Sequence, residues 1–504
     1  MRETVRFLLG DELVEIGACD PTRTLLDWLR IDRRRMGTKE GCAEGDCGAC
    51  TVVVGRLDDG ALRYEAINAC IRFLPTLDGC QVLTVEHLRG PDGKLHPVQQ
   101  AMVDCHGSQC GFCTPGFVMS LFALWLNERA PSLQRVEDAL AGNLCRCTGY
   151  EPIIAAARLM DEADRGQDRF VAAMPAVAAR LAALADLETV AFGDGTKRYY
   201  APATLEALAG LTSAHPEATL VAGATDVGLW VTKAMRRLDP VIHLGRVAGL
   251  QAIADEGAQL RLGAMANHVA VRRALAALSP QLDELMRRFG GEQVRNAGTI
   301  GGNIANGSPI GDLPPALIAL GARLVLAGAE RGGPADGAPA ATIARREIPL
   351  EAFFLDYRKQ DRRPGEVVEA VLVPKPPADA LFHVSKISKR FDEDISAVCG
   401  AFLLRIGPDG RVAEARLAYG GMAAIPKRAA AAEAALTGRA FDEEAVAAAA
   451  AALERDFTPL SDMRASAAYR LSVAGNLLRR FLIESRHGAA ATRVAGPLAE
   501  EAHG

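Results

Sequence analysis

The chain reads GCAEGDCGAC from residue 41 to residue 50, and a further cysteine follows at residue 70. The four cysteines, Cys42, Cys47, Cys50 and Cys70, are separated by four, two and nineteen residues. This spacing is that of plant-type 2Fe–2S ferredoxins, in which each iron takes two thiolates. Glycine or alanine stands beside each cysteine of the loop, so backbone N–H groups can approach negatively charged sulfides. Because zinc sites usually pair two C-x2-C motifs, we interpret this set as cluster ligands.

A second set of cysteines lies in a region with helical signals. Cys110, Cys113, Cys145 and Cys147 are separated by two, thirty-one and one residues. The first two come just before a helix expected to begin at Thr114, and the last two come just after the next helix. An antiparallel helix pair would bring these ends together. On spacing alone, this set could bind either zinc or an iron–sulfur cluster.

The composition is that of an ordinary globular protein. The chain has 504 residues, of which 24% are charged and 49% hydrophobic, enough for three or four domains. A net charge of −5 favours neither nucleic acid nor an anionic membrane. The N-terminus lacks an apolar signal stretch, and the longest bulky apolar run, residues 117–126, is too short to span a bilayer. We therefore expect a cytoplasmic protein with reduced thiols and no membrane or nucleic-acid partner.

Two glycine-containing loops are candidates for a dinucleotide site. Residues 220–228 read LVAGATDVG, typical of a strand, a tight turn and a helix start whose N–H groups could bind a diphosphate. Such a turn is by itself more often only a turn. Residues 296–303 read NAGTIGGN, and the paired glycines would let backbone lie against a ligand. Asp312 follows, where a carboxylate could hold a ribose or adenine group. Neither loop has the Rossmann pattern.

The sequence contains no evident apparatus for oxidising an organic substrate. Its nine histidines lack ligand spacing, and no activated nucleophile stands beside a base. Each cluster exchanges one electron, whereas a flavin exchanges one or two, so a chain with both can convert single-electron delivery into hydride donation. Electrons are therefore expected to enter from another subunit.

The flanks of these motifs carry a specific resemblance. The segments SQCGFCTPG (108–116) and NLCRCTGY (143–150), with both glycine-containing loops, resemble the iron–sulfur and flavin subunit of the bacterial xanthine dehydrogenases, in the molybdenum hydroxylase family. The resemblance covers nearly the whole chain. It implies that the second cysteine set binds a second 2Fe–2S cluster, with Gln109 and Cys147 near the pterin of a molybdenum cofactor held by a partner.

The resemblance also implies an FAD site and an electron-acceptor pocket. The loops would wrap the FAD diphosphate, and Phe289 would pack near the isoalloxazine ring. Tyr357 and Glu393 would lie at the acceptor pocket, and family members often have aspartate at the latter position. The residues implied to contact FAD are Leu220, Val221, Ala222, Gly223, Ala224, Thr225, Asp226, Val227, Phe289, Thr299, Ile300, Gly301, Gly302, Asn303, Asp312 and Lys386.

We therefore predict a multidomain α+β chain. Residues 4–16 alternate around Gly10-Asp11 and predict a hairpin in the first domain. The expected parts are a β-grasp ferredoxin-like 2Fe–2S domain (1–90), a four-helix 2Fe–2S domain (91–160), an alanine-rich linker (161–190), a two-part α/β FAD-binding domain (191–375) and an α/β C-terminal flavoprotein domain (380–500).

The resemblance implies a place in a larger enzyme. A molybdopterin-binding large subunit would oxidise hypoxanthine and xanthine to urate, and electrons would pass through the second cluster, the first cluster and FAD to NAD. Two copies of each chain would form a heterotetramer. The alternatives are an equivalent subunit that serves aldehydes or another N-heterocycle with oxygen or quinone as acceptor, a stand-alone iron–sulfur flavoprotein, and a zinc-stabilised scaffold.

Overall fold

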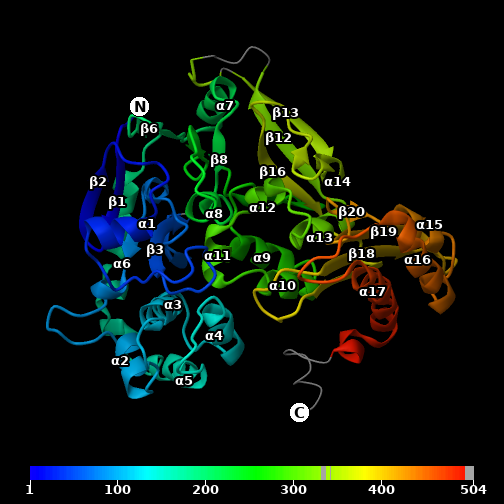
Figure 1. The fold of residues 1–504 in the computed structure, drawn as a ribbon, viewed down its shortest axis with the longest axis horizontal. Helices are drawn as coiled ribbons and strands as arrows, with labels where there is room; N and C mark the ends of the chain where they lie inside the picture. Colours follow the sequence, from blue (N-terminus) through cyan, green and yellow to red (C-terminus); the bar gives the residue numbers. More distant parts are fainter. Residues whose placement is uncertain (59, 331–335, 341, 494–504) are drawn as a thin grey trace. The chain divides into compact units, whose positions relative to one another are not determined.

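The computed structural model describes residues 1–58, 60–330, 336–340 and 342–493 (Figure 1). These residues form two compact units, each assembled from separate stretches of chain. The first unit contains Met1–Ala248, Gly290–Thr299 and the described residues of Ala329–Ile343. The second contains Gly249–Phe289, Ile300–Gly328 and the described residues from Ala344 onward. Both units mix helices with sheets, so the predicted multidomain α+β class is confirmed. Within the described ranges, no helix combines the length and hydropathy needed to cross a bilayer.

A mixed five-stranded sheet forms the N-terminal part of the first unit, in the order β2-β1-β5-β3-β4. Its strands are β1 (Val5–Leu9), β2 (Glu12–Ile16), β3 (Thr51–Asp58), β4 (Ala61–Asn68) and β5 (Gln81–Leu83). The hairpin of β1 with β2 confirms the prediction for residues 4–16, and β1 pairs in parallel with β5. Helix α1 (Leu25–Asp27) and the helical turn η1 (Trp28–Asp32) bury Leu26 and Trp28 in one core with Phe7. This is the expected β-grasp arrangement.

Four helices follow in the first unit, as predicted: α2 (Pro97–Asp104), α3 (Thr114–Asn127), α4 (Leu133–Leu140) and α5 (Glu151–Met160). The Ser132 hydroxyl accepts the N–H of Arg135 at 3.2 Å, so Ser132 caps the start of α4. Helix α3 is buried without interruption from Gly116 to Trp125. It is therefore the central helix of this domain, and its N-terminus carries the loop with Cys110 and Cys113.

The segment 161–190 contains a helix, α6 (Arg169–Leu184), where the sequence predicted a linker. Alanine is the strongest helix former, and the Asp168 carboxylate caps the helix by accepting two backbone N–H groups at 2.8 and 3.0 Å. The other oxygen of Asp168 lies 3.0 Å from Nε2 of His96, the cap of α2. Helix α6 packs against the first sheet through Leu8, Val177 and Leu181.

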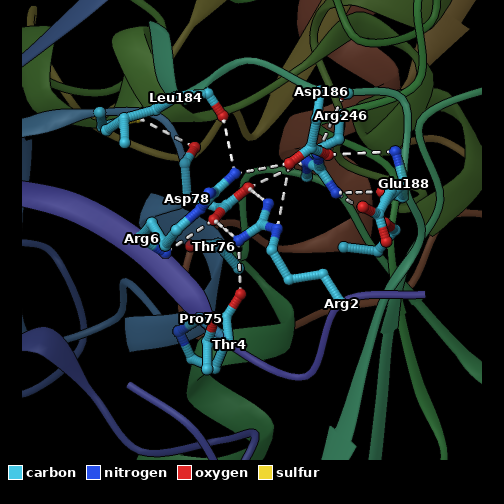
Figure 2. Close-up of polar contacts among 12 residues, drawn as sticks. Arg2, Thr4, Arg6, Pro75, Thr76, Asp78, Leu184, Asp186, Glu188 and Arg246 are labelled. Atoms are coloured by element: carbon cyan, nitrogen blue, oxygen red, sulfur yellow. Dashed lines mark hydrogen bonds and ion pairs between the residues drawn. The ribbon is translucent and has the colours of Figure 1, made fainter. Parts of the chain in front are cut away.

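The chain after α6 is held by a group of partly buried charges (Figure 2). Arg2 binds Asp78 at 2.8 Å, and Arg246 lies 3.0 Å from the same carboxylate. Arg6 and Arg246 each reach Asp186 at 2.6 Å. Burial alone would raise the pKa of Asp186, but the hydrogen bond from Arg246 and the charge of Arg2 hold it below its usual value. The same carboxylate therefore joins the N-terminal strand region to the segment after β9.

A second sheet of the first unit has the order β6-β7-β9-β8. Its strands are β6 (Val190–Gly193), β7 (Arg198–Ala201), β8 (Thr219–Val221) and β9 (Val241–His243). β7, β9 and β8 run parallel, with α7 (Leu205–Ala214) after β7 and α8 (Val227–Thr232) after β8. The turn between β8 and α8 is the first glycine-containing loop. The short helix α11 (Glu292–Ala297) also belongs to this unit.

The second unit contains an antiparallel sheet in the order β10-β11-β16-β12-β13 (Figure 1). Its strands are β10 (Ile253–Asp255), β11 (Gln259–Gly263), β12 (Arg323–Ala329), β13 (Ile343–Pro349) and β16 (Val367–Pro374). The connecting elements are α9 (His268–Ala276), α10 (Pro280–Arg287), α12 (Ile300–Asn306), α13 (Leu313–Ala319), α14 (Leu350–Phe353), β14 (Phe354–Asp356) and β15 (Lys359–Gln360). The helices pack on the sheet through a core that includes Leu262, Ile300, Leu317 and Val371.

The rest of the second unit is a four-stranded antiparallel sheet with three helices. The elements are β17 (Ala380–Ile387), β18 (Val398–Ile406), β19 (Val412–Gly420), β20 (Lys427–Arg428), α15 (Ala430–Leu436), α16 (Glu443–Asp456) and α17 (Ala467–His487). Phe402, Leu453 and Phe481 share the core between them. The domain predicted over 380–500 extends at 494–500 outside the described residues.

Candidate iron–sulfur and flavin sites

The first cysteine set converges between the loop 41–50 and the end of β4. Side-chain hydrogen bonds join Cys42 to Cys47 and to Cys70, and Cys50 to Cys70. The bonds from Cys47 and then Cys70 lower the pKa of Cys42, and the bonds with Cys42 and then Cys50 raise the pKa of Cys70. The structure thus brings together the four side chains that the spacing singled out.

The surroundings of these sulfurs fit a negatively charged cluster. The sulfur of Cys42 accepts the backbone N–H groups of Glu44, Asp46 and Cys47, each at 3.4 Å. A Cβ added to Gly41 would lie 2.8 Å from the sulfur of Cys47, so only glycine leaves that sulfur its place. Inward N–H groups and four thiols are what a 2Fe–2S cluster requires of its protein.

The second cysteine set lies at the helix ends that the sequence predicted. Side-chain hydrogen bonds join Cys113 to Cys145 and Cys147 to Cys110. Burial, followed by the bond with Cys145, raises the pKa of Cys113 to about 12. The sulfur of Cys145 accepts the N–H of Thr148 at 3.3 Å. This set is more open than the first, because Cys110 and Cys147 are exposed.

The thiols of the first set form a chain of contacts in the order Cys47, Cys42, Cys70 and Cys50, whereas those of the second set form two separate pairs. Among the residues that the structure describes, no group of three or more His, Cys, Asp or Glu side chains is arranged to hold one metal ion. A 2Fe–2S cluster divides its four thiolates between two irons, so four neighbouring thiols that do not surround one metal ion suit it as a donor set. All twelve cysteines are free thiols in this structure.

The two cysteine sets are linked through the backbone. The N–H of Leu144, which precedes Cys145, donates to the carbonyl of Cys47 at 3.0 Å. Three apolar side chains that are close in sequence to the cysteines of the second set are exposed. They are Phe112, Leu144 and Tyr150, exposed by 48%, 42% and 40%.

The first glycine-containing loop forms a tight turn between β8 and α8. Ala224 has a φ of +61°, a left-handed conformation that is uncommon outside glycine. A Cβ added to Gly223 would lie 1.7 Å from the carbonyl oxygen of Ala297, so this position tolerates only glycine. The N–H of Gly228 donates to the carbonyl of Ala224 at 2.7 Å. The turn therefore has a defined geometry beside the end of α11.

Helix α8 runs from this turn onto the first cysteine loop. The Thr232 hydroxyl donates to the carbonyl of Ala43 at 2.8 Å, beside Cys42. A Cβ added to Gly228 would lie 2.9 Å from both Cβ and the carbonyl oxygen of Ile71, the residue after Cys70. The first glycine-containing loop and the first cysteine set are thus in direct contact within one unit.

The second glycine-containing loop begins α12 in the second unit. The N–H groups of Ile300 and Gly301 donate to Ala266 and Ala264 at 3.0 and 2.9 Å, which fixes the start of the helix. The side-chain oxygen of Asn303 is buried and has no hydrogen-bond partner among the described residues. A buried acceptor without a partner fits a position that a bound ligand completes.

The remaining residues implied to contact FAD lie in the second unit, where two of them bind each other. Lys386 and Asp312 form a buried ion pair, and the Ser396 hydroxyl also donates to Asp312. Phe289 packs edge-on against His268, with ring centroids 4.8 Å apart. The carboxylate and the ammonium thus neutralise each other inside the protein, an arrangement that the resemblance did not indicate.

The residues implied to lie near electron entry and exit are at the surface. Gln109 is exposed beside Cys110. Tyr357 is 53% exposed and follows β14, with the guanidinium of Arg358 5.3 Å from its ring centroid. Glu393 has a φ of +56° in the loop after β17. Their roles in electron transfer remain predictions.

Two residues that contact the segments around the cysteine sets were not identified from the sequence. Gln293 is completely buried, and Thr232 binds the first cysteine loop. A single buried glutamine has no sequence motif that would mark it as functional. Its partners come from three distant segments, which no local pattern reveals.

Comparison with known families divides the chain into four matched regions. Residues 10–74 match the 2Fe–2S iron–sulfur cluster binding domain, and residues 84–158 match the [2Fe-2S] binding domain. Residues 191–376 match the FAD binding domain in molybdopterin dehydrogenase. Residues 383–485 match the CO dehydrogenase flavoprotein C-terminal domain.

Similar proteins of known name agree with these matches. The xanthine dehydrogenase of Drosophila subobscura is 34% identical over 83% of this chain, and that of Emericella nidulans is 33% identical over 95%. The chain covers only 34% and 38% of these relatives, so it spans about a third of their length.

Solved structures also resemble this chain. Carbon monoxide dehydrogenase from Hydrogenophaga pseudoflava aligns with a TM-score of 0.50 and 32% identity over 56% of this chain and 94% of the other. Quinoline 2-oxidoreductase from Pseudomonas putida 86 aligns with a TM-score of 0.50 and 26% identity over 58% and 97%.

Proposed function

Because this chain belongs to the molybdenum hydroxylase family, with two 2Fe–2S domains and an FAD-binding domain, we propose that it is the electron-transfer subunit of a xanthine dehydrogenase. A partner subunit that holds molybdopterin would oxidise hypoxanthine and xanthine. This chain would deliver the electrons to NAD. The eight cysteines of the two sets are the proposed cluster ligands.

One observation supports the proposal most strongly. Within the first unit, the second cysteine set contacts the first set, and the first set contacts the helix that follows the flavin turn. The second cysteine set opens to the surface at Cys110 and Cys147. The bond between Leu144 and Cys47 joins it to the first set, and Thr232 joins the first set to the helix that follows the flavin turn. When bound, the clusters supply single-electron transfer and FAD supplies the conversion to hydride transfer. A continuous line of contacts from surface to flavin turn suits a relay between a partner and an acceptor.

The apolar rim of the second set supports a protein partner. The rim consists of Phe112, Leu144 and Tyr150, which are exposed and close in sequence to the cysteines of this set, two of whose thiols are also exposed. Exposed apolar side chains grouped at a functional site are typical of a protein–protein interface. We propose that the molybdopterin-binding subunit covers this rim, in a heterotetramer with two copies of each chain.

The acceptor side is assigned to Tyr357 and Glu393. We expect Tyr357→Ala and Glu393→Gln to lower NAD-linked turnover and to leave turnover with an artificial dye intact. The matched control is Tyr469→Ala, because Tyr469 is a tyrosine of similar exposure in the same unit. An equal loss of turnover with NAD and with the dye would contradict this assignment.

The decisive test is purification of the tagged full chain from its native host. We expect a second chain, molybdenum, two 2Fe–2S clusters and one FAD per copy of this chain, and xanthine-dependent reduction of NAD. A preparation with iron and flavin but without molybdenum or a second chain would favour the stand-alone flavoprotein. A preparation without iron and acid-labile sulfide would refute the redox function altogether.

A second candidate follows from the solved structures. Their similarity to a carbon monoxide dehydrogenase and a quinoline 2-oxidoreductase is compatible with an equivalent subunit that serves another substrate. The same complex should therefore be assayed with xanthine, an aldehyde, quinoline and carbon monoxide. NAD, oxygen and a quinone are compared as acceptors. Activity with any substrate but purines would replace the xanthine dehydrogenase proposal and keep the electron-transfer role.

A further inference from the structure

A buried polar cluster lies where the two cysteine loops meet helix α11. We call it the polar junction, and its members are Thr51, Ser120, Asn143 and Gln293. Each side chain is at most 2% exposed. Thr51 directly follows Cys50, and Asn143 precedes Cys145 by two residues. Ser120 belongs to α3, whose N-terminus carries Cys113. The junction therefore includes residues from the segments that carry both cysteine sets.

One carboxamide connects these segments. Nε2 of Gln293 donates to Oδ1 of Asn143 at 2.9 Å and to Oγ of Ser120 at 3.0 Å, and it lies 3.3 Å from Oγ1 of Thr51. The Ser120 hydroxyl donates to the same Asn143 oxygen at 2.7 Å. Nδ2 of Asn143 then donates to the carbonyl of Gly48 at 3.2 Å, inside the first cysteine loop. Gln293 thus orients Asn143, and Asn143 holds the first loop.

The pocket around Gln293 admits little movement. A Cβ added to Gly142 would lie 2.0 Å from Oε1 of Gln293, so the carboxamide fits directly against that backbone. Oε1 is buried and has no hydrogen-bond partner among the described residues. The Nε2 donors, in contrast, face three polar side chains, so the contacts of Gln293 with the junction all pass through this nitrogen.

Helix α11 carries Gln293 at one end and contacts the flavin turn at the other. The carbonyl of Ala297, its last residue, is the group that forbids a side chain at Gly223. Gln293 lies in the region that matches the FAD binding domain, whereas its three partners lie in the two regions that match 2Fe–2S domains. One short helix of the flavin domain thus fixes two cysteine loops and one flavin turn.

We propose that Gln293 is a positioning residue that fixes the distance and orientation of the two cysteine loops relative to each other. Electron exchange between the clusters then depends on a residue of the flavin domain. The inference rests on the proposed function. The bond from Leu144 N–H to the Cys47 carbonyl, at 3.0 Å, is a direct link between the loops, and Asn143 is adjacent to Leu144. Removal of the Gln293 donors takes one of the two hydrogen bonds from Oδ1 of Asn143 and leaves only the one from Ser120. The orientation of Asn143, the distance between the loops and the Leu144–Cys47 bond are then less strictly fixed.

The test uses Gln293→Met in the full chain with its native partner. Methionine keeps the volume and removes both donors. We expect unchanged iron and FAD content, an altered magnetic interaction between the two reduced clusters in EPR, and a several-fold slower redistribution of electrons between the clusters after rapid reduction. The matched control is Gln81→Met, because Gln81 is equally buried in the same unit but bonds Tyr64 and Gly10. It should leave both readouts unchanged.

EPR spectra and rates of Gln293→Met that equal those of the parent protein would overturn the proposal. If that variant loses iron, Thr51→Val and Ser120→Ala decide, because each removes a single hydroxyl from the junction. A changed magnetic interaction in either variant supports the proposal, and parental behaviour in both overturns it. Absence of iron from the parent protein would instead refute the proposed function, so the two failures are distinct.

Discussion

The two cysteine sets hold the same number of thiols in opposite surroundings. In the first set, Cys50 and Cys70 are buried, and the sulfur of Cys42 accepts three backbone N–H groups. In the second set, Cys110 and Cys147 are exposed. The contrast teaches that equivalent donor sets can serve different positions in one relay. The enclosed site adjoins the flavin turn, and the open site is accessible to a partner.

The largest expected effect comes from removal of one ligand from each set. Cys70→Ser and Cys147→Ser should each remove about half of the bound iron, because a 2Fe–2S cluster needs all four ligands. Cys70→Ser should also lower the free energy of unfolding by about 1–3 kcal/mol, since it places a hydroxyl, which is more polar than a thiol, at a buried position. Cys147→Ser, at an exposed position, should change the stability of the protein part by about 0.5 kcal/mol or less.

Iron and acid-labile sulfide assays, with thermal unfolding of each variant, measure both effects. Cys105→Ser is the control, because Cys105 is a half-buried thiol outside both sets. Full iron content in either ligand variant would contradict the ligand assignment, and equal stability losses would remove the contrast between the two sites.

A smaller effect is expected from an iron chelator. The second cluster should lose its iron several-fold faster than the first, because exposed Cys110 and Cys147 leave it open to solvent. EPR spectra recorded over time, with the signals assigned by the two ligand variants, follow each loss separately. Addition of the partner subunit should protect the second cluster. Equal decay of both signals would show that exposure in this structure does not govern access.

The link between the first set and the flavin turn is tested by Gly228→Ala. The added Cβ would lie 2.9 Å from Ile71, and overpacking of this kind costs about 1–3 kcal/mol. Helix propensity returns about 1 kcal/mol, so the net loss of stability is small. We expect reduced FAD content and an altered EPR signal from the first cluster only. Gly17→Ala is the control, since its Cβ would meet only one atom, at 4.0 Å. A change confined to the second cluster would refute the contact.

The smallest expected effect is on the pH dependence of stability, and it tests the Asp168 carboxylate that caps α6 and contacts His96. Burial would raise the pKa of Asp168, but the hydrogen bond from His96 and the N–H groups of Val171 and Phe170 lower it. The stabilisation is therefore fully present above the unfolded pKa of about 3.9 and is lost as pH falls through the lower folded value. Asp168→Asn should be less stable than the parent near neutral pH, with a gap that narrows in acid. Thermal unfolding at several pH values checks this, and a constant gap would contradict it.

The local features of the fold could be predicted from the sequence because they depend on short segments. The ligand spacing from Cys42 to Cys50, the hairpin around Gly10 and the helix start at Thr114 each follow from neighbouring residues. Helix α6 was missed because alanine and charge were taken as linker signals. The high helix propensity of alanine and the Asp168 cap decide that segment instead.

The long-range features could not be predicted from patterns. The pairing of Lys386 with Asp312 and the junction around Gln293 join segments that are far apart in the chain. A buried amide or charged group pairs with whichever polar groups line the pocket around it. Such partners are defined only once the chain has folded. The resemblance therefore identified Lys386 and Asp312 but not the ion pair between them.

The arginine and aspartate group of Figure 2 has a consequence for the engineering of modular redox proteins. A graft that transplants only the cluster-bearing region up to residue 160 would separate Arg2 and Arg6 from Asp186, and it would leave Arg246 behind without Asp78. Every charge of this group lies within Met1–Ala248, but the first unit also includes Gly290–Thr299, where Glu292 pairs with Arg135 at 2.6 Å. The natural unit of exchange therefore contains both stretches and, with them, part of the flavin region.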